Sequence, residues 1–137
     1  MIKKELLDLI EEIKEFNVNN LPKINQEEFD NLVNYIITNE TNISELLWRL
    51  CGEYEEENII FNNVIDYYID NKDYSYLSEL VSYVSDGINQ EYLVEKVIST
   101  EDIEFIEGLL NSFGKAVYSY LDSKYLEKVL EYYNENK

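Results

Sequence analysis

Phe61-Asn62-Asn63-Val64-Ile65-Asp66-Tyr67 is nearly a copy of Phe29-Asp30-Asn31-Leu32-Val33-Asn34-Tyr35, which lies earlier in the chain. A weaker copy of Ile59-Ile60-Phe61 and Val64-Ile65 follows at almost the same spacing, as Tyr92-Leu93-Val94 and Val97-Ile98. A period of about 33 residues is typical of stacked helix pairs, in which each unit buries its apolar face against its neighbours. The sequence therefore predicts a repeated helical hairpin.

Apolar residues at helical spacing extend this pattern over the 137 residues, which is the length of a single domain. Sustained alternation of apolar and polar residues, which would indicate strands, is missing. The segment 17–25 is rich in Asn, contains the only proline and predicts a loop after a first amphipathic helix. We expect one all-α domain of stacked helical-hairpin repeats, with a capping helix and loop in residues 1–25, repeats in residues 26–52, 53–87 and 88–114, and a terminal capping helix in residues 115–137.

Polar residues and glycines mark the expected starts and ends of the helices. Asn42, followed three residues later by Glu45, predicts a capping box, and Asp73 predicts an N-cap one unit later. These two starts correspond at nearly the same spacing as the copies of the first helix, so both helices of the hairpin are repeated. Gly52 predicts the end of a helix, and the pair Asp86-Gly87 predicts a turn.

One segment carries a resemblance to a known family. Asp102-Ile103-Glu104-Phe105-Ile106-Glu107-Gly108-Leu109-Leu110, ending at Phe113-Gly114, resembles the second helix of an ankyrin repeat. The spacing of the copies is similar to that family's period of about 33 residues. The Thr-Pro-Leu-His start of ankyrin repeats is absent, as is the Trp, Gly and Tyr pattern of tetratricopeptide repeats. The resemblance implies degenerate ankyrin-like or HEAT-like helical hairpins.

The chain is strongly acidic, with 29 Asp and Glu against 11 Lys and Arg and a net charge of −18. Residues 1–25 contain 5 acidic and 4 basic residues, residues 26–107 contain 20 and 3, and residues 108–137 contain 4 and 4. A field of this sign repels nucleic acid phosphates and anionic membranes, and it accelerates encounter with basic proteins. We expect a basic protein partner and no direct binding to nucleic acid or membranes; the oligomeric state stays open.

The sequence lacks the residue combinations of common catalytic and cofactor sites. It contains no histidine, which excludes Ser-His-Asp and Cys-His nucleophiles and the ordinary zinc, copper and di-iron sites. The four glycines are isolated and form no phosphate-binding loop. Asp66 and Asp70 lie one helical turn apart, a spacing expected by chance among so many acids, and residues 70–73 lack the ligand spacing of a calcium loop. We predict a protein that is not an enzyme and binds no cofactor or metal.

The single cysteine and the hydropathy bear on the cellular compartment. Cys51 has no partner for an internal disulfide, and its apolar neighbours predict a buried structural thiol. No apolar run reaches the roughly 18 residues of a membrane span. The first residues are amphipathic where a signal peptide would be continuously apolar. We expect a cytoplasmic protein.

Acidic residues gather near the expected turns, in the stretches 53–57, 70–73 and 101–104. Because corresponding turns line up in a stacked array, we expect these stretches to form one negative ridge; the alternative is an acidic surface that is only solvated. Tyr54, between Glu53 and Glu55, is expected to be exposed and to contact a partner, since tyrosine offers a large contact area at small entropic cost. The predicted partner-binding residues are Glu53, Tyr54, Glu55, Glu56, Glu57, Asp70, Asp73, Glu101, Asp102 and Glu104.

Charge and shape favour a protein that binds other proteins. The first hypothesis is an inhibitor whose carboxylates stand where phosphates would bind, similar in kind to bacterial immunity proteins that neutralise nuclease toxins. A phage anti-CRISPR protein or another nucleic-acid mimic is the second hypothesis. A scaffold that associates with itself through a tyrosine-rich face is the third.

Overall fold

The computed structural model describes residues 2–112 and 116–137, and in these two ranges the chain is all-α and has no strand. The expected boundary at residue 114 and the ankyrin-like ending at Phe113-Gly114 lie outside the described residues. Among the described helices, none combines the length and the apolar character needed to cross a membrane. The helices are α1 (Lys4–Lys14), α2 (Gln26–Asn39), α3 (Ile43–Glu53), α4 (Asn62–Asp70), α5 (Tyr74–Tyr83), the short 3-10 helix η1 (Ser85–Gly87), α6 (Gln90–Ser99), α7 (Ile103–Asn111), α8 (Ala116–Tyr120) and α9 (Ser123–Asn136).

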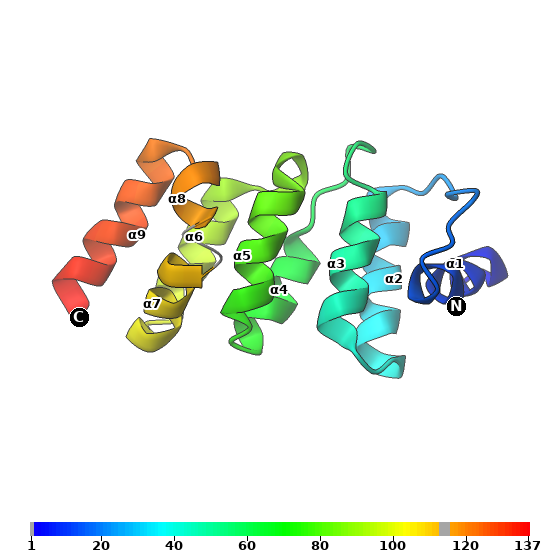
Figure 1. Cartoon of the computed structure of the whole chain (residues 1–137), viewed down its shortest axis with the longest axis horizontal. Coiled ribbons are helices and arrows are strands. Elements are labelled where there is room, and N and C mark those ends of the chain that lie inside the picture. The colour runs from blue at the N-terminus through cyan, green and yellow to red at the C-terminus, as the bar shows by residue number, and fades with distance from the viewer. Residues whose placement is uncertain (1, 113–115) are drawn as a thin grey trace.

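The helices stack in two layers, which confirms the expected all-α stack of helical hairpins (Figure 1). In one layer α2, α4, α6 and α9 pack side by side, and in the other α3, α5 and α7 do so. The first helix, α1, lies across the N-terminal end and packs against α3. Since the chain reverses at every helix, the turns within each pair and the connectors between pairs lie at opposite edges of the stack.

The C-terminal end contains a helix that the sequence did not predict. The short helix α8 packs against α5 and α7, and it buries Val117, while Leu121 is buried directly after it. The next helix, α9, then takes the position beside α6 in its layer. With only one fully buried residue, Val129, α9 closes the stack with a largely polar outer face.

The duplicated stretch forms the core, and its copies touch. The side chains of Phe29, Val33, Phe61 and Ile65 are fully buried, with an exposed fraction of 0%. The ring centroids of Phe29 on α2 and Phe61 at the start of α4 are 5.4 Å apart. Burial of such side chains is the main stabilising term of the stack, at about 1.5–3 kcal/mol each. The repeat in the sequence is therefore a repeat in packing.

A glutamine at the start of α2, and another at the start of α6, ties its helix to the connector that follows the helix pair. Gln26 Nε2 donates to the Ile60 carbonyl at 2.7 Å, and the Ile60 N–H donates to Gln26 Oε1 at 2.8 Å. At the start of α6, Gln90 Oε1 accepts from the Asp122 N–H at 2.7 Å. Because the glutamine satisfies backbone groups outside the helices, it fixes where the next helix can begin.

Side-chain caps explain where several helices start. Asn25 and Glu28 form a capping box on α2, and Asp73 accepts from the Tyr76 N–H, as predicted for the start of α5. The capping box predicted at Asn42 is wrong. Asn42 is left-handed, with φ 57°, and its amide donates to Glu45 Oε2 in place of accepting a backbone N–H.

Two glycines lie where another side chain packs closely against the backbone. Gly52 lies inside α3, one residue before its end. Gly87 ends η1, where a Cβ atom would lie only 2.2 Å from the buried ring of Phe61. The Phe61 N–H also donates to the Gly87 carbonyl at 3.0 Å. Only glycine allows the backbone to approach the Phe61 ring this closely.

Substitution of Gly87 tests this contact. We expect Gly87→Ala to lower the free energy of unfolding by about 1–3 kcal/mol, because the added methyl group must displace a fully buried ring. Denaturant unfolding followed by circular dichroism measures the change. The adjacent substitution Asp86→Ala, at an exposed residue, should change stability by less than about 0.5 kcal/mol. Equal stability of the two variants would contradict the packing of Gly87 against Phe61.

Candidate functional site

The predicted partner-binding residues divide between the two edges of the stack. Residues 53–57 belong to the connector between α3 and α4, at the upper edge in Figure 1. Residues 70–73 and 101–104 belong to the turns at the lower edge. With 9 residues in α4, the edges are separated by roughly 14 Å, beyond the Debye length of about 8 Å at physiological salt. The prediction of one continuous ridge is therefore wrong.

At the lower edge, two of the predicted residues hold the turns together. Asp73 accepts from the Ser44 hydroxyl at 2.6 Å and caps α5. Asp102 accepts from the Phe105 N–H at 3.0 Å and pairs with Lys72 at 3.4 Å. The backbone hydrogen bond from Phe105, and then Lys72, hold the pKa of Asp102 below its usual range. Both carboxylates are thus engaged within the chain.

The rest of the lower edge has mixed charge. Asp70, Glu101 and Glu104 are exposed. Lys72 and Lys96 line the same hollow as Asp70, and Lys96 also pairs with Asp66 at 3.3 Å. Asp66 accepts in addition from the Tyr92 hydroxyl. A basic partner would meet two lysines here, so the lower edge is the weaker candidate.

Tyr54 is not the exposed contact residue that its acidic neighbours suggested. Its exposed fraction is 1%, and its ring packs edge-on against Phe29, with centroids 5.9 Å apart. Its hydroxyl donates to the Pro22 carbonyl at 2.6 Å. At the end of α3 the backbone points this side chain into the core while Glu53 and Glu55 point outward. The expectation that Tyr54 is exposed is therefore wrong, and its side chain anchors the loop 17–25.

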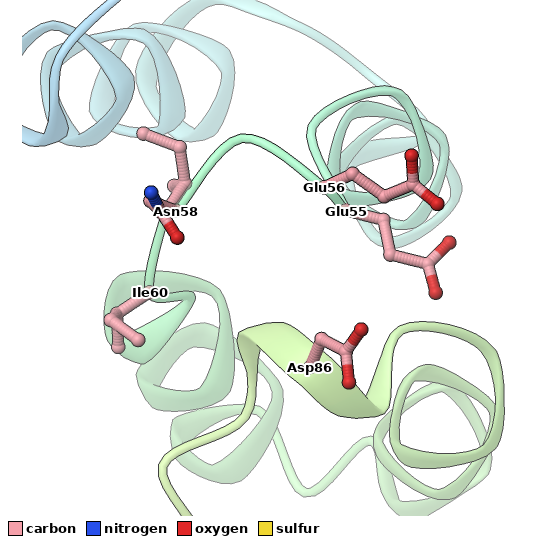
Figure 2. Close-up of a pocket in the computed structure, with 6 residues that line it drawn as sticks. Glu55, Glu56, Asn58, Ile60 and Asp86 are labelled. Carbon is pink, nitrogen blue, oxygen red and sulfur yellow. The ribbon is translucent and has the colours of Figure 1, made fainter.

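At the upper edge, carboxylates surround an open hollow of about 480 Å³ (Figure 2). Glu55 and Glu56 extend from the α3–α4 connector, and Asp86 faces them from η1. Asn58 and Ile60 line the opposite side. Ile60 is 39% exposed, so the hollow combines negative charge with an accessible apolar side chain.

The upper edge is rich in acidic side chains between α3 and α6. No lysine or arginine occurs in residues 50–71 or 73–95. Among the described residues, no ion pair involves the carboxylates of this edge, whereas each of the three basic residues in 26–107 has an acidic partner. We call this group of residues the acidic edge: Glu53, Glu55, Glu56, Glu57 and Asp86.

Asp86 was missed as a site residue because the pair Asp86-Gly87 was interpreted only as a turn. A signal was present in the sequence. Glu55 and Asp86 are separated by the same number of residues as Asn42 and Asp73, which begin the second helices of two successive pairs. Residues at equivalent positions of stacked units lie on the same edge, so applying that spacing to the acidic connector would have placed Asp86 opposite Glu55.

Metal-ligating side chains and the single cysteine are further chemical features of the chain. Within residues 2–112 and 116–137, no group of three or more His, Cys, Asp or Glu side chains is arranged to hold a metal ion. Cys51 is buried, as predicted, and burial raises the pKa of its thiol. The arrangement of the acidic edge is suited to binding a cationic surface.

Comparison with the models of known families, with curated proteins and with solved structures gives no match. The resemblance to ankyrin-like or HEAT-like hairpins therefore stays a prediction from the sequence.

Asp73 and Asp70 lie near the turn between α4 and α5, and their substitution tests whether each contributes to stability. We expect Asp73→Ala to lower the free energy of unfolding by about 1–2 kcal/mol, because it removes the cap of α5 and the bond to Ser44. Asp70→Ala, at an exposed position, should cost less than about 0.5 kcal/mol. Thermal and denaturant unfolding measure both, and a stable Asp73→Ala variant would refute the structural role.

The buried tyrosines predict how the protein responds to alkali. Burial raises the pKa of Tyr54 and of Tyr68 above the ordinary value of about 10. The stability that comes from keeping them neutral is fully present below about pH 10 and is lost as the pH rises toward their folded-state pKa values. In a titration of tyrosinate absorbance, these two of the 13 tyrosines should ionise only as circular dichroism shows unfolding. Ionisation of all tyrosines near pH 10 in a folded protein would contradict their burial.

Proposed function

We propose that this protein is a non-enzymatic inhibitor that binds a basic surface of another protein through its acidic edge. The observation that carries the proposal is the uncompensated charge of that edge. Residues 26–107 hold 20 acids and 3 bases, and all three bases are already paired within the chain. Such a field accelerates encounter with a basic partner and disfavours nucleic acid and anionic membranes.

The proposed partner is a nuclease-type toxin, and the protein would act as its immunity protein. The carboxylates of Glu55, Glu56 and Asp86 would occupy positions where the partner binds phosphates. Ile60, on the other side of the hollow, would add apolar contact at the centre of the interface, where burial contributes most. Covering the nucleic-acid-binding or active-site surface would block the toxin without any chemical step.

Two alternatives make different demands on the molecule. A phage anti-CRISPR protein or another nucleic-acid mimic would use the same carboxylates, and only the identity of the partner separates it from an immunity protein. A scaffold would associate with itself through exposed tyrosines, such as Tyr74, Tyr83 and Tyr120. Two copies would then have to bring chains of net charge −18 together, which the field disfavours.

Charge reversal at the two edges tests the proposal. The triple variant Glu55→Lys, Glu56→Lys and Asp86→Lys is compared with a matched control at the lower edge, Asp70→Lys, Glu101→Lys and Glu104→Lys. Both change the net charge equally, and none of the six carboxylates is in an ion pair among the described residues. We expect the first variant to lose at least about tenfold in affinity for the partner at low salt and the control to lose much less.

The measurement begins with capture of partners from the native host at low and high salt, followed by their identification. The expected partner is a basic nucleic-acid-binding protein whose capture weakens as salt increases, and whose nuclease activity falls when the wild-type protein is added in equal amount. Capture of a neutral or acidic protein alone, or capture that is indifferent to salt, would overturn the proposal. Equal effects of the two triple variants would rule out the acidic edge as its site.

A further inference from the structure

A second, smaller hollow of about 80 Å³ adjoins the acidic edge, and its lining is aromatic. Phe16, Trp48 and Tyr83 line it together with Glu53 and Arg49. The two hollows have no lining residue in common, but their lining residues come from neighbouring parts of the chain. Glu53 and Glu55 are close neighbours at the end of α3, while Tyr83 and Asp86 lie on either side of the step from α5 to η1. The aromatic hollow and the carboxylate hollow therefore lie near the ends of the same two helices, α3 and α5.

The aromatic part is built from a stacked pair. The rings of Trp48 and Tyr83 have centroids 4.5 Å apart and planes inclined by 23°. Gly52 makes room for this arrangement, because a Cβ atom there would lie 2.6 Å from the Tyr83 ring. Tyr83 nevertheless remains 46% exposed. A fixed and accessible aromatic platform thus joins α3 to α5.

The third ring, Phe16, is 74% exposed and shows which kind of group this surface accepts. The guanidinium of Arg49 lies over it, 3.6 Å from the ring centroid. That guanidinium also donates to the carbonyls of Ile13 and Lys14, and it pairs with Glu45 at 3.2 Å. A guanidinium on a ring, held by carbonyl and carboxylate oxygens, is an arrangement that the chain already makes with its own arginine.

We infer that the rings of Phe16, Trp48 and Tyr83 are the anchor for an arginine-rich segment of the basic partner, with Glu53 and the acidic edge pairing with its flanking charges. The inference rests on the proposed function and names the chemistry of the partner. Charge complementarity is the reason for this occupant. Glu53 lines the hollow, and the only cation that lines it among the described residues, Arg49, is already paired with Glu45. A second copy of the chain would place acidic edge near acidic edge.

Arginine fits this patch better than lysine. Its planar guanidinium stacks on aromatic rings, is weakly hydrated and can bind a carboxylate with two hydrogen bonds at once. Lysine is a compact, strongly hydrated charge that would be attracted by the acidic edge with little gain from the rings. The inference therefore predicts discrimination between two cations of equal charge.

The test uses oligoarginine and oligolysine peptides of equal length as probes, with Trp48 as reporter. Trp48 is the only tryptophan, so its fluorescence reports directly on this patch. We expect both peptides to bind at low salt, oligoarginine about two- to fivefold more tightly, and only oligoarginine to change the Trp48 emission. Calorimetry gives the affinities independently of fluorescence.

Three variants complete the design. Phe16→Leu and Tyr83→Leu keep apolar bulk but remove a ring, and each should bring the affinity for oligoarginine close to that for oligolysine. Tyr74→Leu, at the opposite end of α5, is the matched control and should keep the preference. Phe16 is largely exposed, so its variant stays informative if Tyr83→Leu unfolds, which circular dichroism would reveal.

The outcomes separate this inference from the proposed function. Equal binding of both peptides with unchanged Trp48 emission would overturn the aromatic anchor and leave the acidic edge as the binding site. Failure of both peptides to bind at low salt would remove the electrostatic basis of the proposed function and the inference with it. A Trp48 emission that changes with protein concentration alone, together with dimer formation, would show that a second copy covers the patch and would also overturn it.

Discussion

The contact between Phe29 and Phe61 is the interaction on which the rest of the structure depends. Each helix pair has an apolar face that it cannot bury alone, and these rings, with centroids 5.4 Å apart and both fully buried, join one pair to the next. The same Phe61 ring lies against Gly87, and its N–H bonds to the Gly87 carbonyl. Because Gly87 is fixed in this way, the preceding residue, Asp86, is held opposite Glu55. The core contact therefore also positions one carboxylate of the acidic edge, that of Asp86.

The distribution of charge indicates that the acidic edge is not needed for stability. Where the chain uses carboxylates structurally, they are engaged, as Asp73 is with Ser44 and Asp102 with Lys72. The acidic edge has no such bonds among the described residues, and its like charges repel one another. Glu53 is the last residue of α3, where a negative charge interacts unfavourably with the helix dipole, and the last turns of α3 and α5 contain no basic residue. These carboxylates lower the stability of the free protein slightly.

The stack could be predicted from the sequence because the residues repeated in it are residues of the core. Phe29, Phe61, Val64 and Ile65 are apolar at helical spacing, and all four belong to the same buried cluster. The sequence also allowed the cap at Asp73 and the burial of Cys51 to be predicted. Tyr54 was predicted to be exposed although it continues the helical spacing of Leu47 and Cys51, because the helix was expected to end at Gly52. Asn42 was expected to cap α3 from an extended backbone, but it is left-handed, a conformation that asparagine tolerates. The single ridge was wrong for a topological reason, because turns and connectors alternate between edges. The ring of Tyr83 over Gly52 joins two separate helices and leaves no local pattern.

The acidic edge lies close to the rings of Trp48 and Tyr83 because α3 and α5 run in the same direction and end at the same edge. The end of α3 supplies Glu53 beside Trp48, and the end of α5 supplies Tyr83 shortly before Asp86. A cation bound there would lie near the negative ends of two helices, over rings that attract it and beside carboxylates that form no ion pair within residues 2–112 and 116–137. The negative helix ends and the neighbouring carboxylates repel one another in the free protein, and a bound arginine would neutralise them. Binding of a basic partner would therefore gain from charges that the chain leaves uncompensated, and the partner would be selected by the same groups that attract it.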